Sequence, residues 1–294
     1  MRYMFKMMNN ARLGVGVEGL AVAEGALQHA AAFALERRQG RAVGAPAGEQ
    51  SLIVDHPDVR RMLLTMRAYI DAMRCVLYAN SSALDVAKRH PDPETRQAAS
   101  DRAELLTPIS KAWCTDLGVE LTSIGIQVHG GYGYIEETGA AQYLRDSRIS
   151  PIYEGTNGIQ ALDLVGRKLP LREGGVVGDL LAEIGSLDAS LAEAGAGFES
   201  IRANLADAQA ATGEATRWLI ASGAGDPTDA MAGATPYLRM LGQLVGGWLL
   251  ARLALGAHRR LADGGDDEFL ASKIVVARFY AEQLLPLARA QMGA

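Results

Sequence analysis

Apolar residues recur at steps of three and four positions through most of the chain, the spacing that places them on one face of an α-helix. The first stripe starts after position 9 and stops near Gln39 and Gly40. It therefore predicts a long helix over about residues 9–39, and its small residues permit close packing against neighbours. The residues expected to face inward are Leu13, Val17, Leu20, Ala23, Leu27, Ala30 and Ala34.

A second stripe follows a loop that extends through Gly48. The sequence Asp55-His56-Pro57 is typical of an N-cap followed by proline in the first helical turn. His90-Pro91-Asp92-Pro93 ends the pattern. This region predicts a second helix, and its inward residues are Val59, Leu63, Met66, Ile70, Met73 and Leu77.

Further helices are expected over about residues 94–127, with Pro108 as a kink, over about 140–145, and over about 159–169. The pattern is helical nearly throughout. We therefore predict an all-α fold, in which residues 9–169 form an up-and-down bundle of four main helices.

Beyond Pro170 the helical pattern becomes rich in alanine and glycine and is broken at 174–175, 223–227 and 264–265. We place a second helical module there, which gives two domains, residues 1–170 and 171–294. The most apolar window, 240–257, contains Gln243 and Arg252 and is too short for a membrane span, so a buried helix is favoured. The second module has two stripes that are expected to face inward. One is Leu180, Ile184, Leu187 and Leu191, and the other is Leu241, Leu244, Trp248 and Leu255.

Charge and cysteine content narrow the possible functions. The formal net charge of −5 provides no basic field that would attract nucleic acid. Cys75 and Cys114 lie within helical patterns without paired spacing, which is typical of a reducing cytoplasm, and the five histidines form no metal motif. The N-terminal residues lack the pattern of an export signal. We therefore expect a cytoplasmic protein without a metal site.

Two segments carry most of the candidate chemistry. In residues 127–133, Gln-Val-His-Gly-Gly-Tyr-Gly, the glycines lack a Cβ, so a bulky group can approach the main chain and its amides. In residues 153–158, Tyr-Glu-Gly-Thr-Asn-Gly, the Glu154 carboxylate lies on a turn between an aromatic residue and a glycine. A partly desolvated carboxylate there suits proton abstraction. A solvated loop glutamate is the alternative reading of the spacing alone.

These motifs resemble those of a known family. Residues 1–169 are similar to the C-terminal helical domain of the acyl-CoA dehydrogenases, flavoproteins that form a Cα–Cβ double bond in acyl-CoA thioesters. In that family Tyr-Glu-Gly-Thr carries the catalytic base and Gln-x-x-Gly-Gly-x-Gly contacts FAD. Residues 145–149, Arg-Asp-Ser-Arg-Ile, and residues 33–39, Phe-Ala-Leu-Glu-Arg-Arg-Gln, also match, in the family's order and separations.

The resemblance implies roles for the residues near the base. Glu154 would remove the α-proton of an acyl-CoA while hydride leaves Cβ for the flavin. Some branches place the base one residue before the arginine of the first helix, but that position is Ala11 here. Arg12 would help to order the base and the substrate, with a surface ion pair as the alternative. Tyr153 would line the acyl pocket, with ordinary packing as the alternative.

The resemblance also implies FAD as cofactor. Its ligands would be Arg37, Gln39, Gln127, Gly130, Gly131 and Thr156. The first two would bind phosphates across a dimer, the next three would contact the adenosine end of that flavin, and Thr156 would touch the flavin beside its own base. The implied partners are an acyl-CoA substrate, electron-transfer flavoprotein as electron acceptor, and further copies of the chain in a dimer or tetramer.

Family members carry a helical domain and a β-domain before this helical domain. We therefore expect a C-terminal fragment that is inactive and binds FAD weakly, or not at all, by itself. Residues 171–294 resemble the C-terminal extension of larger bacterial members, including the methylmercaptopropionyl-CoA dehydrogenase branch, by position and helical character alone. Two alternatives stay open: a noncatalytic helical assembly module, and a nucleic-acid-binding acyl-CoA dehydrogenase-like protein.

Overall fold

The computed structural model of the chain describes residues 2–225, 227–265 and 267–293. The protein is 83% helical, and the described residues form no β-strand, so the predicted all-α fold class is confirmed. A single antiparallel bridge between Arg38 and Leu52 closes the loop after the first helix.

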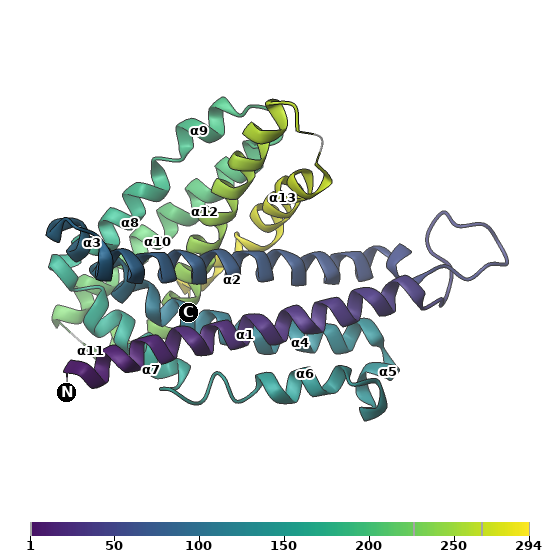
Figure 1. The fold of residues 1–294 in the computed structure, drawn as a ribbon, viewed down its shortest axis with the longest axis horizontal. Helices are drawn as coiled ribbons and strands as arrows, with labels where there is room; N and C mark the ends of the chain where they lie inside the picture. Colours follow the sequence, from purple (N-terminus) through teal and green to yellow (C-terminus); the bar gives the residue numbers. More distant parts are fainter. Residues whose placement is uncertain (1, 226, 266, 294) are drawn as a thin grey trace.

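The first bundle comprises helices that run side by side in Figure 1. Its α1 helix contacts α2, α4 and α6 along its length. The predicted third helix is continuous through a π-turn, η2, and α7 continues into a second π-turn, η4. The bounds are α1 (Arg2–Glu36), α2 (Pro57–Arg89), α3 (Pro93–Pro108), η2 (Ile109–Trp113), α4 (Cys114–His129), α5 (Gly131–Tyr134), α6 (Ala140–Ser147), α7 (Asn157–Asp163) and η4 (Leu164–Lys168).

Local sequence explains the starts of α2 and α3. The N-cap Asp92 accepts a hydrogen bond from the Thr95 amide at 2.8 Å, and Pro93 occupies the first turn of α3. At α2 the predicted N-cap followed by proline is formed by His56 and Pro57, without a side-chain hydrogen bond from the cap. Asp55 lies in the 3-10 turn η1 (Ile53–Asp55), and its carboxylate is 3.4 Å from the Arg60 guanidinium.

The stripe on α1 needs one correction. Leu20, Ala23 and the small residues that follow are buried as expected, whereas Val17 is 46% exposed. The reason is that α1 meets η2 and α4 through glycines: a Cβ at Gly16 would lie 2.2 Å from the Ser110 carbonyl oxygen, and one at Gly19 would lie 2.8 Å from that of Cys114. This close approach fixes the rotation of the helix and turns Val17 outward.

Proline at position 108 produces the predicted irregularity without ending the helix. Proline has no N–H to donate to the preceding turn. At the next residue the helix widens into the π-turn η2, which accommodates the missing hydrogen bond without ending the helix. A π-turn displaces the side chains that follow by part of a turn, so the side chains of η2 point where a regular helix would not send them.

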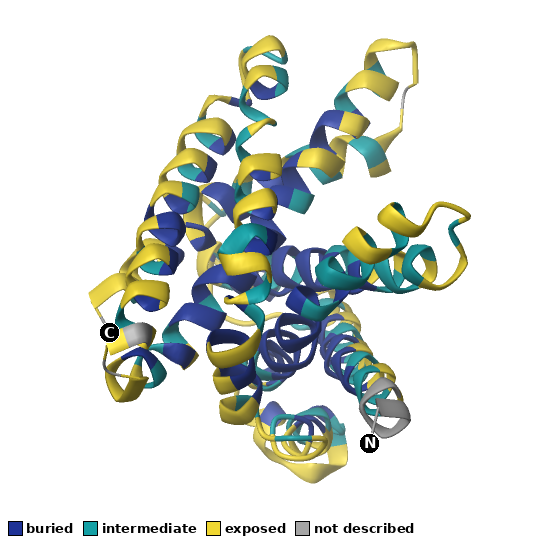
Figure 2. Cartoon of the chain, turned by 90° about the vertical axis from the view of Figure 1, so that its left-hand side faces the viewer, coloured by how far each residue is buried: buried dark blue, intermediate teal, exposed yellow. Residues whose placement is uncertain are grey.

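The second module (residues 171–293 as described) packs against the first bundle rather than standing apart. Its α12 helix contacts α2, η2 and α7, and one hydrophobic core contains buried residues of both parts (Figure 2). Ion pairs of 2.8 Å between Lys273 and Asp71 and of 2.7 Å between Arg239 and Glu120 also join them. The bounds are η5 (Leu171–Gly174), α8 (Gly175–Gly185), α9 (Asp188–Glu193), α10 (Glu199–Gly225), α11 (Pro227–Ala232), α12 (Ala234–Ala262), α13 (Glu268–Phe279), η6 (Tyr280–Leu284), α14 (Leu287–Ala290) and η7 (Gln291–Gly293).

The α12 helix is long and apolar enough to cross a membrane by length and composition. In the fold, however, 78% of its most apolar window is buried against other helices. Leu241, Leu244, Trp248 and Leu255 of the predicted stripe are all buried. The helix therefore has the burial of a core helix, as the sequence favoured.

Candidate functional site

Glu154 lies on a strained turn between α6 and α7. Its φ is 56°, a left-handed conformation that is uncommon for a residue with a side chain, and Gly155 follows at φ 83°. A Cβ at Gly155 would lie 2.8 Å from Gln160 Nε2, so glycine is required there for both reasons. The Thr156 side chain then accepts a hydrogen bond from the Ile159 amide at 3.3 Å and caps α7. We call residues 151–157 the Glu154 turn.

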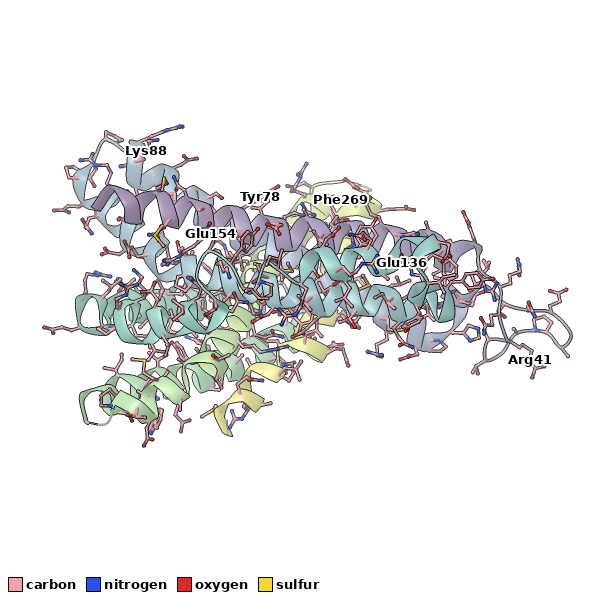
Figure 3. All side chains as sticks on the ribbon, turned by 90° about the horizontal axis from the view of Figure 1, so that it is seen from below. Arg41, Tyr78, Lys88, Glu136, Glu154 and Phe269 are labelled. Carbon is pink, nitrogen blue, oxygen red and sulfur yellow. The ribbon has the colours of Figure 1, made fainter. Side chains whose placement is uncertain are left out.

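The carboxylate of Glu154 is exposed, on the loop that Figure 3 draws between α6 and α7. The expected partial desolvation is therefore not provided by the described residues. Large apolar side chains close to it in the sequence are exposed as well. They are Ile149, Ile152, Ile159 and Leu162.

Arg12 lies beneath the turn and is only 6% exposed. Its Nη1 is 3.7 Å from Asp163 Oδ2 and donates to Asn9 Oδ1 at 3.3 Å. Its Nη2 is 3.7 Å from the point where a Cβ of Gly155 would stand, and its Nε is buried without a hydrogen-bond partner. The arginine is therefore a buried support of the turn rather than a member of a surface ion pair.

Tyr153 stands beside Glu154 at 37% exposure. Its hydroxyl donates a hydrogen bond to the Glu18 carboxylate of α1. That hydrogen bond, followed by burial and the charge of Glu18, raises the pKa of Tyr153 to about 12, so the phenol stays a neutral donor at physiological pH. The contact ties the turn to α1 on its outer side.

The residues assigned to FAD separate into two groups. Thr156 lies with Glu154, whereas the others gather where the end of α1 meets α4 and α5. There the Arg37 guanidinium lies 5.1 Å from the centre of the Tyr132 ring. Arg12 and Arg37 are 25 positions apart on or just beyond one helix, which corresponds to roughly 38 Å at 1.5 Å per residue. The structure therefore places two groups of candidate residues far apart on the bundle.

The second group has the chemistry of a phosphate and nucleoside site. Arg37 supplies a cation, and Gln39 and Gln127 supply exposed amides. Gly130 has φ 60°, and no atom lies within 4 Å of a Cβ placed at Gly130 or Gly131, so a ligand can reach the main chain there. These residues fit the phosphate and adenosine parts of a flavin dinucleotide.

Sequence reasoning missed a buried polar cluster behind the Glu154 turn. Lys111, in the π-turn η2, is fully buried, and its Nζ donates to Asn157 Oδ1 at 2.8 Å. Asn157 Nδ2 donates to Asp116 Oδ1 at 2.7 Å. Gln160, also fully buried, lies with its Nε2 3.4 Å from the Gly155 carbonyl oxygen. The available signal was a lone lysine in the apolar run Ile109-Ser110-Lys111-Ala112-Trp113.

Burial determines the electrostatics of this cluster. It lowers the pKa of Lys111 to about 8, although Asp116 opposes the shift. Burial also raises the pKa of Asp116, opposed by its hydrogen bond from Asn157 and by the charges of Arg239 and Lys111. His129 is buried as well, and its Nδ1 lies 2.7 Å from the Gly125 carbonyl oxygen. The described residues hold no group of three or more side chains suited to a metal ion.

Comparisons with known proteins agree with these motifs. Residues 1–169 match the family described as acyl-CoA dehydrogenase, C-terminal domain, and residues 180–294 match the family described as acetyl-CoA dehydrogenase C-terminal like. Over 286 residues the chain is 47% identical to 3-methylmercaptopropionyl-CoA dehydrogenase of Ruegeria pomeroyi, covering 97% of this chain and 48% of that protein. A butyryl-CoA dehydrogenase of Syntrophomonas wolfei is 31% identical, covering 97% of this chain and 47% of that protein.

Among solved structures, an acyl-CoA dehydrogenase from Bacillus anthracis complexed with FAD is similar in fold, with a TM-score of 0.75 and 20% identity. The alignment covers 98% of this chain and 48% of that one. The chain thus spans about half the length of the curated relatives it matches.

Proposed function

Because the chain belongs to the acyl-CoA dehydrogenase family, we propose that it supplies the catalytic base of an FAD-dependent α,β-dehydrogenation of an acyl-CoA thioester, with Glu154 as that base. The observation that carries the proposal is the Glu154 turn itself. A carboxylate is presented at φ 56°, and Arg12 and Gln160 support its main chain from below. Strain of this kind persists where the surrounding structure imposes it, and it concentrates at functional sites.

The surroundings of Glu154 fit an acyl thioester. The exposed apolar side chains on either side of the turn offer contacts to an acyl chain. Bound substrate would exclude water from the carboxylate, which the chain alone leaves exposed. Glu154 would then accept the α-proton, and FAD, when bound, would accept the hydride from Cβ.

The separation of the two groups supports a shared flavin site. Because Arg37 and the Gly130 segment lie roughly 38 Å from Arg12 along α1, one flavin dinucleotide next to Glu154 would not reach them within the same chain. We assign them to the phosphates and adenosine of the flavin of a neighbouring copy in a dimer or tetramer. We further propose that electron-transfer flavoprotein accepts the electrons from the reduced flavin. We also propose that the protein is cytoplasmic.

Flavin reduction tests the proposed function. The holoenzyme that contains this chain should be mixed anaerobically with 3-methylmercaptopropionyl-CoA and, separately, with butyryl-CoA, the thioesters named in its relatives. Loss of the oxidised flavin absorbance with formation of the enoyl product is the expected result. A protein that holds stoichiometric FAD but is reduced by no saturated acyl-CoA contradicts the proposal.

A further inference from the structure

Lys111 is a buried cation next to the proposed base. Burying an ammonium group is costly unless it is paired and hydrogen-bonded, and a side chain needed only to fill this volume would be apolar. The lysine reaches its position because η2 is a π-turn, which lies directly against α1 at Gly16.

The ammonium contacts Asn157, the first residue of α7 and the last of the Glu154 turn. The Asn157 side chain accepts from Lys111 Nζ and donates to Asp116 Oδ1 at 2.7 Å and Thr115 Oγ1 at 2.9 Å. Its backbone N–H donates to the Pro151 carbonyl oxygen at 3.0 Å and so closes the turn. Asn157 therefore fixes the end of the segment that contains Glu154, three residues from the base.

Charged groups from several elements act on Lys111. Asp116 from α4, Glu154 from the turn and Glu18 from α1 favour the ammonium form, whereas Arg12 from α1 and burial oppose it. Arg239 of α12 acts on the cluster through Asp116. The charge of Lys111 thus balances the carboxylates around the turn.

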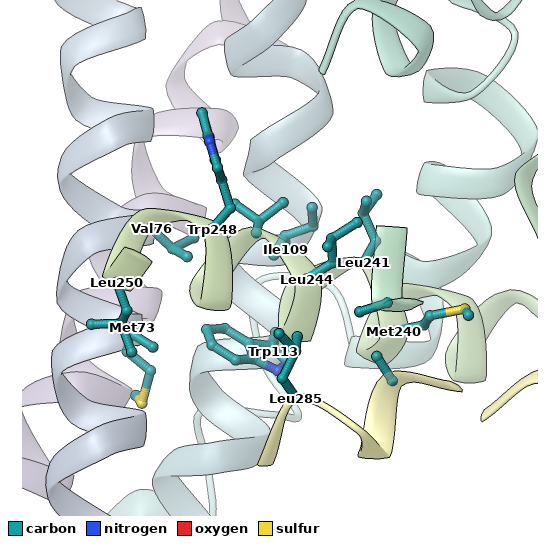
Figure 4. Packing of buried hydrophobic residues seen from close by; sticks show 14 of the residues in the cluster. Met73, Val76, Ile109, Trp113, Met240, Leu241, Leu244, Trp248, Leu250 and Leu285 are labelled. Carbon is teal, nitrogen blue, oxygen red and sulfur yellow. The ribbon is translucent and has the colours of Figure 1, made fainter. Parts of the chain in front are cut away.

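The π-turn is also held from its opposite side by the second module. A Cβ at Gly242 of α12 would lie 2.6 Å from Trp113 Cγ, and one at Gly246 would lie 2.9 Å from Trp113 Cη2. Figure 4 shows Trp113 beside Leu244 and Leu285 in this packing. With glycines of α1 on one side and of α12 on the other, η2 has little room to shift, and Lys111 is fixed with it.

From this geometry we infer that Lys111 is a positioning residue for Glu154. Its ammonium group holds Asn157, and through it the Glu154 turn, in the orientation needed for proton abstraction. The inference rests on the proposed function, because it assigns Lys111 to the same site. It gives the second module a role as well, since α12 supports the π-turn that carries Lys111.

Replacing Lys111 by methionine in the holoenzyme tests the inference. Lys111→Met keeps the length of the side chain and removes the charge and the hydrogen bond to Asn157. Flavin reduction at saturating acyl-CoA should fall on the order of 10-fold to 10²-fold, as for a small misplacement of a reacting group. FAD content and acyl-CoA affinity should stay near those of the wild type. Thermal stability is measured beside the rate, because removing one partner from a buried polar cluster lowers stability by itself and must be separated from the loss of positioning.

Lys168→Met is the matched control. Lys168 also lies in a π-turn, η4, and its ammonium pairs with Glu104 away from the Glu154 turn. This control should reduce its flavin at the wild-type rate. Equal losses in both variants, or a Lys111→Met enzyme as fast as the wild type, would overturn the inference. So would a Lys111→Met enzyme that loses FAD, substrate affinity and stability together, since that result indicates a folding role.

The pH profile and a double variant separate positioning from packing. With a pKa of about 8, Lys111 is mainly charged below pH 8 and loses its charge above it. Wild-type flavin reduction should therefore decline above about pH 8, and Lys111→Met should lack this decline.

The double variant Asn157→Ala with Lys111→Met should lose no more of the flavin-reduction rate than the worse single variant, because both residues act on Glu154 through the same contact. Additive losses, or an unchanged pH profile, contradict the inference. A wild-type holoenzyme that acyl-CoA cannot reduce instead rejects the proposed function on which it rests.

Discussion

The two halves of the chain bury different kinds of side chain. In the first bundle the buried charged groups are Arg12, Asp71, Lys111 and Asp163. In the described part of the second module the buried polar side chains are neutral, namely Thr212, Thr216 and Gln243. Buried charge is costly and requires partners. Asp71 pairs with Lys273 of the second module, whereas Arg12, Lys111 and Asp163 mark the prearranged polar site beside the Glu154 turn.

The second module contributes packing to that site. Its core joins that of the first bundle, and α12 presents glycines to Trp113 and leucines to the shared interior. The first bundle therefore provides the polar site, and the second module provides the apolar packing that supports it. Substitutions in the first should change the reaction more than the fold, and those in the second should do the reverse.

The largest effect is expected at Glu154. Glu154→Gln keeps the shape and hydrogen-bonding capacity of the side chain and removes the base, so flavin reduction in the holoenzyme should fall by ~10²-fold to ~10⁴-fold. Glu154→Asp, shorter by one methylene, should show an intermediate loss. Acyl-CoA binding and thermal stability should persist, because the side chain is exposed. Glu173→Gln is the control, since Glu173 is also exposed and left-handed at φ 56°. Unchanged reduction in Glu154→Gln would require another base.

A core leucine of α12 should show the opposite behaviour. Leu244 is fully buried, so Leu244→Ala should lower the free energy of unfolding by about 2–5 kcal/mol. Below its transition temperature the variant should lose less of its flavin-reduction rate than Lys111→Met, because α12 acts on Lys111 only through its packing on η2. Leu253→Ala on the same helix is the control, because Leu253 is 37% exposed and should cost much less. Denaturant titration and stopped-flow reduction measure the two quantities. A large loss of rate in the folded Leu244→Ala enzyme would contradict the division between the halves.

The helical pattern was predictable from sequence wherever apolar spacing was regular. The apolar stripe of α2 faces the core as its spacing predicted. The Pro-Asp-Pro boundary before α3 also matches the structure, because caps and prolines act locally. Val17 was assigned to the wrong face because the close approach of α1 to η2 depends on glycines, which carry no weight in an apolar stripe.

The candidate site was predictable only in its motif residues. The Glu154 turn could be found because its sequence is contiguous, but its left-handed backbone and its exposure could not be predicted from residue types. Lys111 lies 43 positions before Glu154, and only the π-turn after Pro108 brings it behind the turn. Long-range placement of this kind is set by packing rather than by local sequence.

A smaller effect is expected at the link between Tyr153 and Glu18. Tyr153→Phe removes one hydrogen bond at a partly exposed position, which should lower the free energy of unfolding by about 0.5–1 kcal/mol. Because the pKa of Tyr153 is raised to about 12, its contribution is fully present below the ordinary tyrosine pKa and is lost only as pH rises through about 12. Denaturant titrations at neutral pH and at about pH 9 should therefore give the same difference. A difference that disappears by pH 9 would mean that the phenol loses its proton below the ordinary tyrosine pKa, which contradicts the raised pKa.

The smallest effect is expected from replacing a glutamate that has a left-handed backbone. Glu173 and Glu154 both have this conformation, but only Glu154 is the proposed base. Asparagine adopts the left-handed region more readily than glutamate, so Glu173→Asn, at the junction of the two halves, should raise the free energy of unfolding by about 0.5 kcal/mol. Flavin reduction should not change. Glu154→Asn should stabilise the chain by a similar amount and abolish reduction, because strain and function coincide only at that turn. Thermal denaturation of both variants beside the wild type measures the gain. If Glu173→Asn is stabilised and Glu154→Asn is not, the surrounding contacts of Arg12 and Gln160, rather than the backbone conformation, set the energy of the Glu154 turn.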